Sequence, residues 1–244
     1  MAGHSRWAKV KHFKGGIDAK RGKIFAKLGK EMSVAAKHGG GDPAFNPRLR
    51  TIIMKAKAAN MPVDNIERAI KKGTGELGNV SYEELTYEGY APGGVAVLVE
   101  LLTDNKNRSA GEIRAIFTKH GGNLSPAKHL FHRKGQFLIA KDQIAEDDLI
   151  ALALEAGAED VLTHADNYEI LTDPHQFEAV HKALDAKKLK PASAEIAYLP
   201  TTPVPVADAK TARQILDLLE ALEDNDDVQN VYSTEDIPDA LLAG

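Results

Sequence analysis

Apolar residues recur at helical spacing in the first third of the chain. Ile24, Leu28 and Met32 lie four residues apart, with Phe25 and Ala35 beside them, which predicts one buried stripe on a helix that ends at the glycines 39–41. Two more stretches with helical periodicity begin at prolines, one at residue 47 behind the expected N-cap residue 46 and one at residue 62. Residues 21–73 therefore predict a small helical bundle.

From residue 82 the pattern changes to the alternation that is typical of strands. Residues 85–102 predict two strands joined by a glycine turn, and a helix is expected at 108–120. Residues 136–199 give strand, helix, strand, strand, helix and strand, an order that specifies the ferredoxin-like split motif. The tail adds a helix at 209–223 and a strand, which together with residues 82–133 complete a second set of the same kind.

The predicted fold class is α+β, with an N-terminal helical bundle followed by two ferredoxin-like α/β domains, the third inserted into the second. The expected domains are a basic helical N-terminal domain with a flexible arm at 1–80, a middle α/β domain formed by 81–135 plus 203–244, and an inserted α/β domain at 136–202. The proline-rich segment LPTTPVPV marks the exit from the insertion.

Composition narrows the class of protein. The chain of 244 residues has no cysteine, which excludes disulfides, thiolate zinc sites and a cysteine nucleophile. It has neither the apolar core of a signal peptide nor a run of about 20 apolar residues that could span a membrane. The expectation is a cytoplasmic protein without a membrane partner.

Charge is distributed very unevenly. Residues 1–80 carry 17 Lys and Arg against 6 Asp and Glu, whereas residues 81–244 carry 14 against 29. A surplus this one-sided attracts a polyanion, and Lys and Arg neutralise nucleic-acid phosphates without reading bases. The residues predicted to bind nucleic acid are Arg6, Lys9, Lys11, Lys14, Lys20, Arg21, Lys23, Lys27 and Lys30, with a second patch of Arg48, Arg50, Lys55 and Lys57.

Two aromatic residues lie among the first of these cations. Trp7 and Phe13 could stack on unpaired bases, as aromatic residues do in proteins that bind single strands, or they could anchor the arm to the bundle. The sequence leaves both alternatives open.

No set of residues predicts catalysis. Asp104 and its neighbours in TDNKNR are explained as turn and capping residues, and His129 and His132 lack a third metal ligand. The acidic run 224–227 lacks the glycine and the final glutamate of a calcium loop and is expected to be a solvated turn. We therefore expect no catalytic residue, no metal, no cofactor and no small-molecule substrate.

Several motifs together resemble one family. MAGHSRWAKVKH, DAKRGKIFAKL, GGGDPAFNPRLR, KAANMPVDNIERAIKKGTGE, YEGYAPGGVAVLVE, TDNKNRSAGEIR and KHGGNL occur in the order of the YebC/PmpR family. The resemblance implies a three-domain protein without catalytic activity or cofactor. Family members are described as DNA-binding transcriptional regulators, and others, including a mitochondrial relative, act on ribosomes and assist proline-rich synthesis.

The first hypothesis is a non-enzymatic regulator of gene expression, with DNA or ribosomal RNA as the partner of the basic domain. The acidic α/β domains would then face a protein partner or solvent. The alternatives are a protein-interaction scaffold, whose basic domain docks on an acidic protein, and a hydrolase that uses Asp104, His120 or His132.

Overall fold

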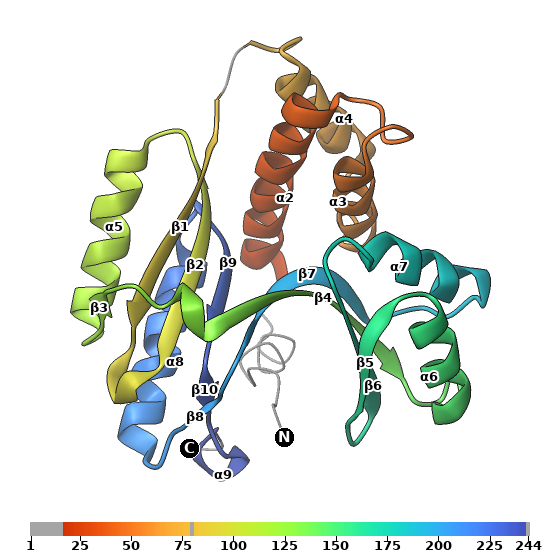
Figure 1. Cartoon of the computed structure of the whole chain (residues 1–244). Helices are drawn as coiled ribbons and strands as arrows, with labels where there is room; N and C mark the ends of the chain where they lie inside the picture. The colour runs from red at the N-terminus through yellow and green to blue at the C-terminus, as the bar shows by residue number, and fades with distance from the viewer. Residues whose placement is uncertain (1–16, 79–80, 243–244) are drawn as a thin grey trace. The chain divides into compact units, whose positions relative to one another are not determined.

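A computed structural model of the chain describes residues 17–78 and 81–242 (Figure 1). These residues form two compact units, one made of 17–128 with 203–242 and the other of His129–Thr202. The second unit is thus inserted into the first. Helices come first and two antiparallel sheet domains follow, which confirms the predicted fold class. The domain limits expected from the sequence stay a prediction.

Three helices form the N-terminal bundle: α2 (Ile17–Gly39), α3 (Pro47–Ala58) and α4 (Val63–Thr74). Their buried side chains form one cluster, whose largest members are Met32, Leu49, Ile52, Met61 and Ile66. Phe25 and Leu28 pack against this cluster, as the periodicity predicts.

The prediction for Ile24 is wrong, because its side chain is 47% exposed. The reason is length. At about 1.5 Å per residue, α2 with its 23 residues extends for about 35 Å, whereas α3 and α4 with 12 residues each extend for about 18 Å. The two shorter helices therefore cover only part of α2.

Asn46 fixes the connection between α2 and α3. Its side chain is almost fully buried, and its Oδ1 accepts a hydrogen bond from the Leu49 amide at 3.0 Å, as expected of an N-cap. Its Nδ2 also donates to the carbonyl oxygens of Ala35 and Gly40, each at 2.8 Å. One side chain thus holds the end of α2 and the start of α3 together.

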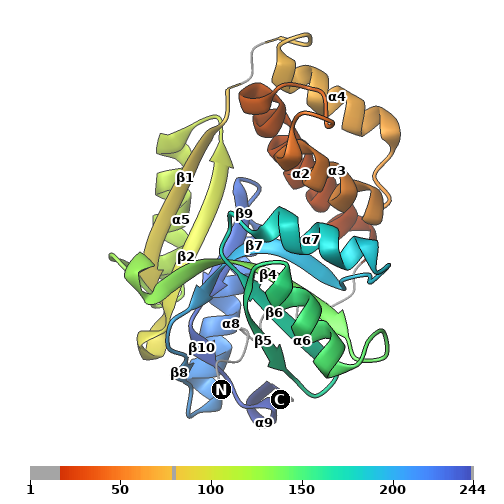
Figure 2. The same ribbon diagram turned by 45° about the vertical axis from the view of Figure 1, so that its right-hand side comes forward.

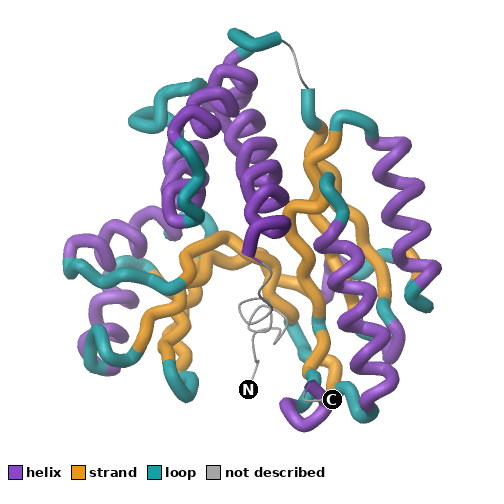
Figure 3. Tube along the Cα trace, turned by 180° about the vertical axis from the view of Figure 1, so that it is seen from behind, coloured by secondary structure: helices purple, strands orange, loops and turns teal. Residues whose placement is uncertain are grey.

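The first sheet has the order β3-β1-β2-β9, and all neighbours are antiparallel. Its strands are β1 (Glu83–Tyr90), β2 (Ala96–Thr103), β3 (Asn123–Leu124) and β9 (Val228–Ser233). Helices α5 (Lys106–Lys119) and α8 (Ala209–Asp224) lie on the same side of it (Figure 3). Their apolar residues form one core with the inner face of β2, the predicted face of Val95, Val97 and Val99.

Short elements complete this unit. The turn between β1 and β2 contains the single 3-10 turn η1 (Pro92–Gly94). After the insertion, β8 (Val204–Pro205) pairs in parallel with β10 (Glu235–Asp236), and α9 (Asp239–Leu242) ends the described chain.

The inserted unit has the ferredoxin-like strand order β5-β6-β4-β7. After the 3-10 turn η2 (Lys128–Leu130), its elements are β4 (Phe131–Ala140), α6 (Glu146–Glu155), β5 (Ala158–Thr163), β6 (Asn167–Thr172), α7 (Phe177–Ala186) and β7 (Ser193–Pro200). Figure 2 shows α6 and α7 together on one face of this sheet, where they bury Phe137, Ile139 and Ile170.

Strand β4 begins five residues before the predicted start at residue 136. Its first half, FHRKG, has no alternating pattern, but it pairs with β7 from Phe131↔Pro200 onward. Pairing with a distant strand therefore extends the element beyond what local periodicity indicates.

The helices of the described ranges include no candidate for a membrane span, since each is too short or too polar.

Candidate nucleic-acid interface

Part of the predicted site lies outside the described residues. This part comprises Arg6, Trp7, Lys9, Lys11, Phe13 and Lys14. The backbone of Lys20 belongs to α2, but its side chain is not described. Arg21 lies exposed on α2. The remaining predicted cations fall into two groups, one on α2 and one on α3.

The α2 group faces carboxylates of the same compact unit. Lys23 Nζ lies 2.9 Å from Asp224 Oδ1, and Lys27 Nζ donates to the Glu223 carbonyl oxygen at 2.7 Å. Lys30 Nζ lies 2.7 Å from Asp227 Oδ1. These three lysines follow each other at four and three residues, so they share one face of α2. That face therefore contacts residues 223–227, the end of α8 and the loop after it, which we call the acidic turn.

Asp227, the last residue of the acidic turn, is only 4% exposed. Besides Lys30, three donors from the start of α5 and the end of β2 bind its Oδ2. They are Arg108 Nη2 at 2.7 Å, Ser109 Oγ at 2.8 Å and Thr103 Oγ1 at 3.0 Å. Asp227 thus joins α2, β2 and α5, segments that are more than a hundred residues from it in sequence.

These contacts change the ionisation of Asp227 and of its partner Arg108. Burial alone would raise the pKa of Asp227, but the hydrogen bonds from Lys30, Arg108, Ser109 and Thr103 outweigh it and hold this pKa well below its usual range. The hydrogen bond to Asp227 in turn raises the pKa of Arg108, and a second bond to Asp104 adds to this. Both groups are charged at neutral pH.

The expectation of a solvated turn at 224–227 is therefore wrong for Asp227, although Asp224 and Asp226 are exposed. The hydrogen-bond donors to the Asp227 carboxylate lie between 118 and 197 residues away, so no local pattern marks it. The acidic turn also binds the basic helix of its own chain, which adds an intramolecular contact to the expected role of the acidic part.

The α3 group has different surroundings. The 12 residues of α3 include four cations, Arg48, Arg50, Lys55 and Lys57, and no acid. Arg48 pairs with Glu84, and Arg50 Nη1 donates to the Pro43 carbonyl oxygen at 3.1 Å. All four surround the helix outside its buried face of Leu49, Ile52 and Ala56.

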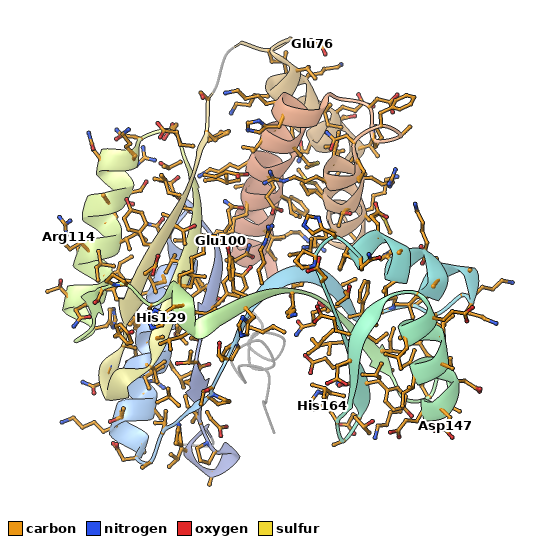
Figure 4. All side chains as sticks on the ribbon, viewed as in Figure 1. Glu76, Glu100, Arg114, His129, Asp147 and His164 are labelled. Carbon is orange, nitrogen blue, oxygen red and sulfur yellow. The ribbon has the colours of Figure 1, made fainter. Side chains whose placement is uncertain are left out.

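Asp104 and Asn105, two of the polar residues considered for catalysis, have structural partners. Asn105 caps α5 by accepting a hydrogen bond from the Arg108 amide, and Asp104 Oδ1 lies 2.9 Å from Arg108 Nη2. In the described ranges, no group of three His, Asp or Glu side chains could hold a metal ion. Figure 4 shows the side chains, with His129, one of the two histidines considered as ligands, labelled.

Fold and charge together define a class: an α+β protein with a positively charged helical domain followed along the chain by two acidic α/β domains. The chain belongs to the TACO1/YebC family. The model of the TACO1/YebC protein N-terminal domain matches residues 5–76, and the model of the TACO1/YebC second and third domain matches residues 82–234.

Relatives match along the whole chain. A protein of Syntrophobacter fumaroxidans is 54% identical over 245 residues, which cover 99% of this chain and 98% of that protein. One of Treponema denticola is 55% identical over 244 residues, with coverage of 99% and 98%. Both are named probable transcriptional regulatory protein. The crystal structure of a conserved hypothetical protein from Aquifex aeolicus has a TM-score of 0.85 and 48% identity, covering 96% of this chain and 98% of that one.

Proposed function

We propose that the chain is a non-enzymatic regulator of gene expression that binds nucleic acid through its helical domain. The observation that carries the proposal is the charge of α3, four cations without an acid in 12 residues. Such a surface gains affinity for a polyanion by releasing counterions from its phosphates. The name of the relatives, probable transcriptional regulatory protein, supports a regulatory role.

Duplex DNA is the first target that we propose, because the relatives are named as regulators of transcription. Ribosomal RNA is the alternative, since contacts to phosphates carry no base information and suit both polymers. In either case the cations of the N-terminal arm, Arg6 to Lys14, would add phosphate contacts, and Trp7 and Phe13 would stack on bases or anchor the arm.

The two groups of cations would contribute differently. Lys23, Lys27 and Lys30 already contact the acidic turn, so nucleic acid would compete with it for them. The mutational test uses the cations of α3, because Arg48, Lys55 and Lys57 are exposed, although Arg48 also pairs with the exposed Glu84. Arg50 is left unchanged in this test because it binds the loop before α3.

The test is the affinity for duplex DNA and for a ribosomal RNA fragment, measured by fluorescence anisotropy from about 50 to 200 mM salt. The variant is Arg48→Ala with Lys55→Ala and Lys57→Ala. The matched control removes three exposed lysines from the inserted unit, Lys182→Ala, Lys187→Ala and Lys190→Ala. The α3 variant should lose affinity and reduce the salt slope by about 0.9 for each lost DNA phosphate contact. Equal effects of both triple variants would contradict a role for α3.

Crosslinking in cells, followed by sequencing of all bound nucleic acid, separates the targets. Reads at discrete promoters that disappear in the α3 variant would support a transcriptional regulator. Reads concentrated in ribosomal RNA would support a translation factor. If neither exceeds the control, the basic domain binds a protein, and the scaffold hypothesis takes the place of both.

A further inference from the structure

A cavity of about 630 Å³ lies in the helical domain, where the C-terminal ends of α2 and α4 approach the residues that precede β1. This volume is within the range of small-ligand sites, about 300 to 1,000 Å³. Among the residues that line it, the charged ones are Lys37 and Lys72, and the hydroxyl residues are Thr74 and Ser81. None of the described residues in this lining is acidic.

Both lysines have neutral partners. Lys37 Nζ donates to Ser81 Oγ at 2.9 Å, and Lys72 Nζ donates to the Tyr82 hydroxyl at 3.1 Å while it lies over the Tyr82 ring. An ammonium group has three donors, so each lysine can make further hydrogen bonds. Two positive charges thus face one cavity, and the partners named here do not neutralise them.

The negative C-terminal ends of the two helices offset only part of the charge of the lysines. Lys37 and Lys72 lie in the last turns of α2 and α4, where the helix dipole favours a cation. Each helix end contributes about half a negative elementary charge, so two ammonium groups leave a positive surplus. The acid nearest to Lys72 in sequence is Glu76, which is labelled beyond α4 in Figure 4. Its Oε1 accepts a hydrogen bond from Thr74, a residue of the cavity lining, at 2.8 Å.

Two glycines of the cavity lining directly follow α2 and α4. Gly40 and Gly75 line it with φ angles of +83° and +88°, which an L-residue with a side chain rarely adopts. An added Cβ at Gly40 would meet no other atom within 4 Å, so the surroundings of this residue are open. A second polar cleft, around Lys30 and Arg108, is less suited to an anion, because the acids Asp104 and Glu112 and the acidic turn line it as well.

From this cavity we infer a binding site for a phosphate group, held by Lys37 and Lys72 of the helical domain. Its natural source would be a backbone phosphate of the bound nucleic acid, and that part of the inference rests on the proposed function. A free phosphate compound has the same chemistry, and the experiment distinguishes the two sources.

The first arm uses inorganic phosphate and the full chain. Amide NMR spectra are recorded during a phosphate titration at constant ionic strength. We expect saturable shifts at Gly40 and Gly75, which disappear in Lys37→Gln with Lys72→Gln and persist when both lysines are replaced by Arg. Lys71→Gln is the matched control, because it removes an exposed neighbouring charge from α4 outside the cavity lining. Shifts that do not saturate, or that survive in the Gln pair, would overturn the site.

Folding is checked in the same spectra. If the Gln pair disturbs signals throughout the bundle, the single variant Lys37→Gln gives the answer instead, since Lys37 is exposed and its one hydrogen bond in the cavity is to Ser81. Saturable shifts that keep their full size in this variant would also overturn the site.

The second arm measures duplex DNA binding by the same variants. A backbone phosphate in the cavity predicts that the Gln pair lowers the salt slope by about 0.9 and that phosphate competes with the duplex. If phosphate binds but the Gln pair leaves duplex binding unchanged, the site takes a free phosphate compound and the backbone assignment is wrong. If the wild type binds no nucleic acid at all, the proposed function fails, while the phosphate titration still decides the site.

Discussion

Replacing Asp227 by Asn tests whether the acidic turn is a structural clamp between α2 and the first sheet. The substitution keeps the shape of the side chain and removes its charge. Asn retains one oxygen acceptor, but its amide group donates hydrogen bonds, as Lys30, Arg108, Ser109 and Thr103 also do. At least one side of Asp227 would then place donor against donor.

The expected loss of unfolding free energy at pH 7 is about 3 kcal/mol. Removing one partner of a buried ion pair costs about 3 to 5 kcal/mol. The lower end of this range applies because the Arg108 side chain is 45% exposed and can turn toward water. Some cost remains because the Lys30 side chain is only 18% exposed. Chemical unfolding in urea, followed by circular dichroism, measures this difference.

The pH dependence of stability tests the role of the Asp227 charge independently, because the direction of the change can be predicted. The pKa of Asp227 is lower in the folded chain than the unfolded value of about 3.9, so its ionised form stabilises the fold above that pH. This stabilisation is lost as the pH falls through 3.9 and further toward the folded pKa. The Asn variant has nothing to lose there. The difference between wild type and variant should therefore shrink by about 1 kcal/mol from pH 7 to pH 3.

Asp226→Asn is the control, because it removes a charge from the exposed neighbour, whose carbonyl oxygen rather than its carboxylate binds Lys30. It should change the unfolding free energy by less than about 0.5 kcal/mol. The reasoning is refuted if Asp227→Asn is as stable as this control at pH 7, or if its deficit is the same at pH 3 as at pH 7.

Two further substitutions, with Gly111→Ala on α5 as a control, test the packing and capping of the bundle by thermal and urea unfolding. Gly73→Ala should lower the free energy of unfolding by about 2 to 3 kcal/mol, because the new Cβ would lie 2.2 Å from the Ser33 carbonyl oxygen. Gly111→Ala has open space on α5, so it should leave this free energy unchanged or raise it by up to about 1 kcal/mol. Asn46→Ala should cost about 2 kcal/mol, since the Leu49 amide loses its cap and two carbonyl oxygens lose a buried donor. Wild-type stability of Gly73→Ala or Asn46→Ala would contradict these packing and capping arguments.

Local patterns predicted most of the helices because each of them buries one face. Leu49, Ile66 and Phe117 are buried as their helical spacing predicts, and the alternation of β2 identified its inner face correctly. Ile24 shows where this reasoning ends. Its spacing is as regular as that of Met32, but the neighbours that bury Met32 are too short to reach it. Periodicity gives the face of a helix, and only the partner's length gives how much of it is covered.

Charge composition identified the basic domain but not the partners of its cations. Lys30 and Lys57 are indistinguishable in the sequence, both being lysines on helices of a basic segment. In the folded chain Lys30 binds a buried carboxylate from 197 residues away, whereas Lys57 is exposed on a helix without acids. The cavity beside Lys37 was missed for the same reason, because its lysines come from two helices and their hydroxyl partners from the segment before β1.

The partner of each cation decides how much it can contribute to binding a polyanion. A phosphate that displaces Asp227 from Lys30 replaces one ion pair by another and takes from a buried carboxylate one of its two cations, so it gains little. A phosphate that reaches Lys37 or Lys72 meets ammonium groups that donate hydrogen bonds to neutral hydroxyls, and it can add new ion pairs there. We therefore expect nucleic acid to contact α3 and the cavity first, while the face of α2 with Lys23, Lys27 and Lys30 serves to hold the bundle to the sheet through the acidic turn.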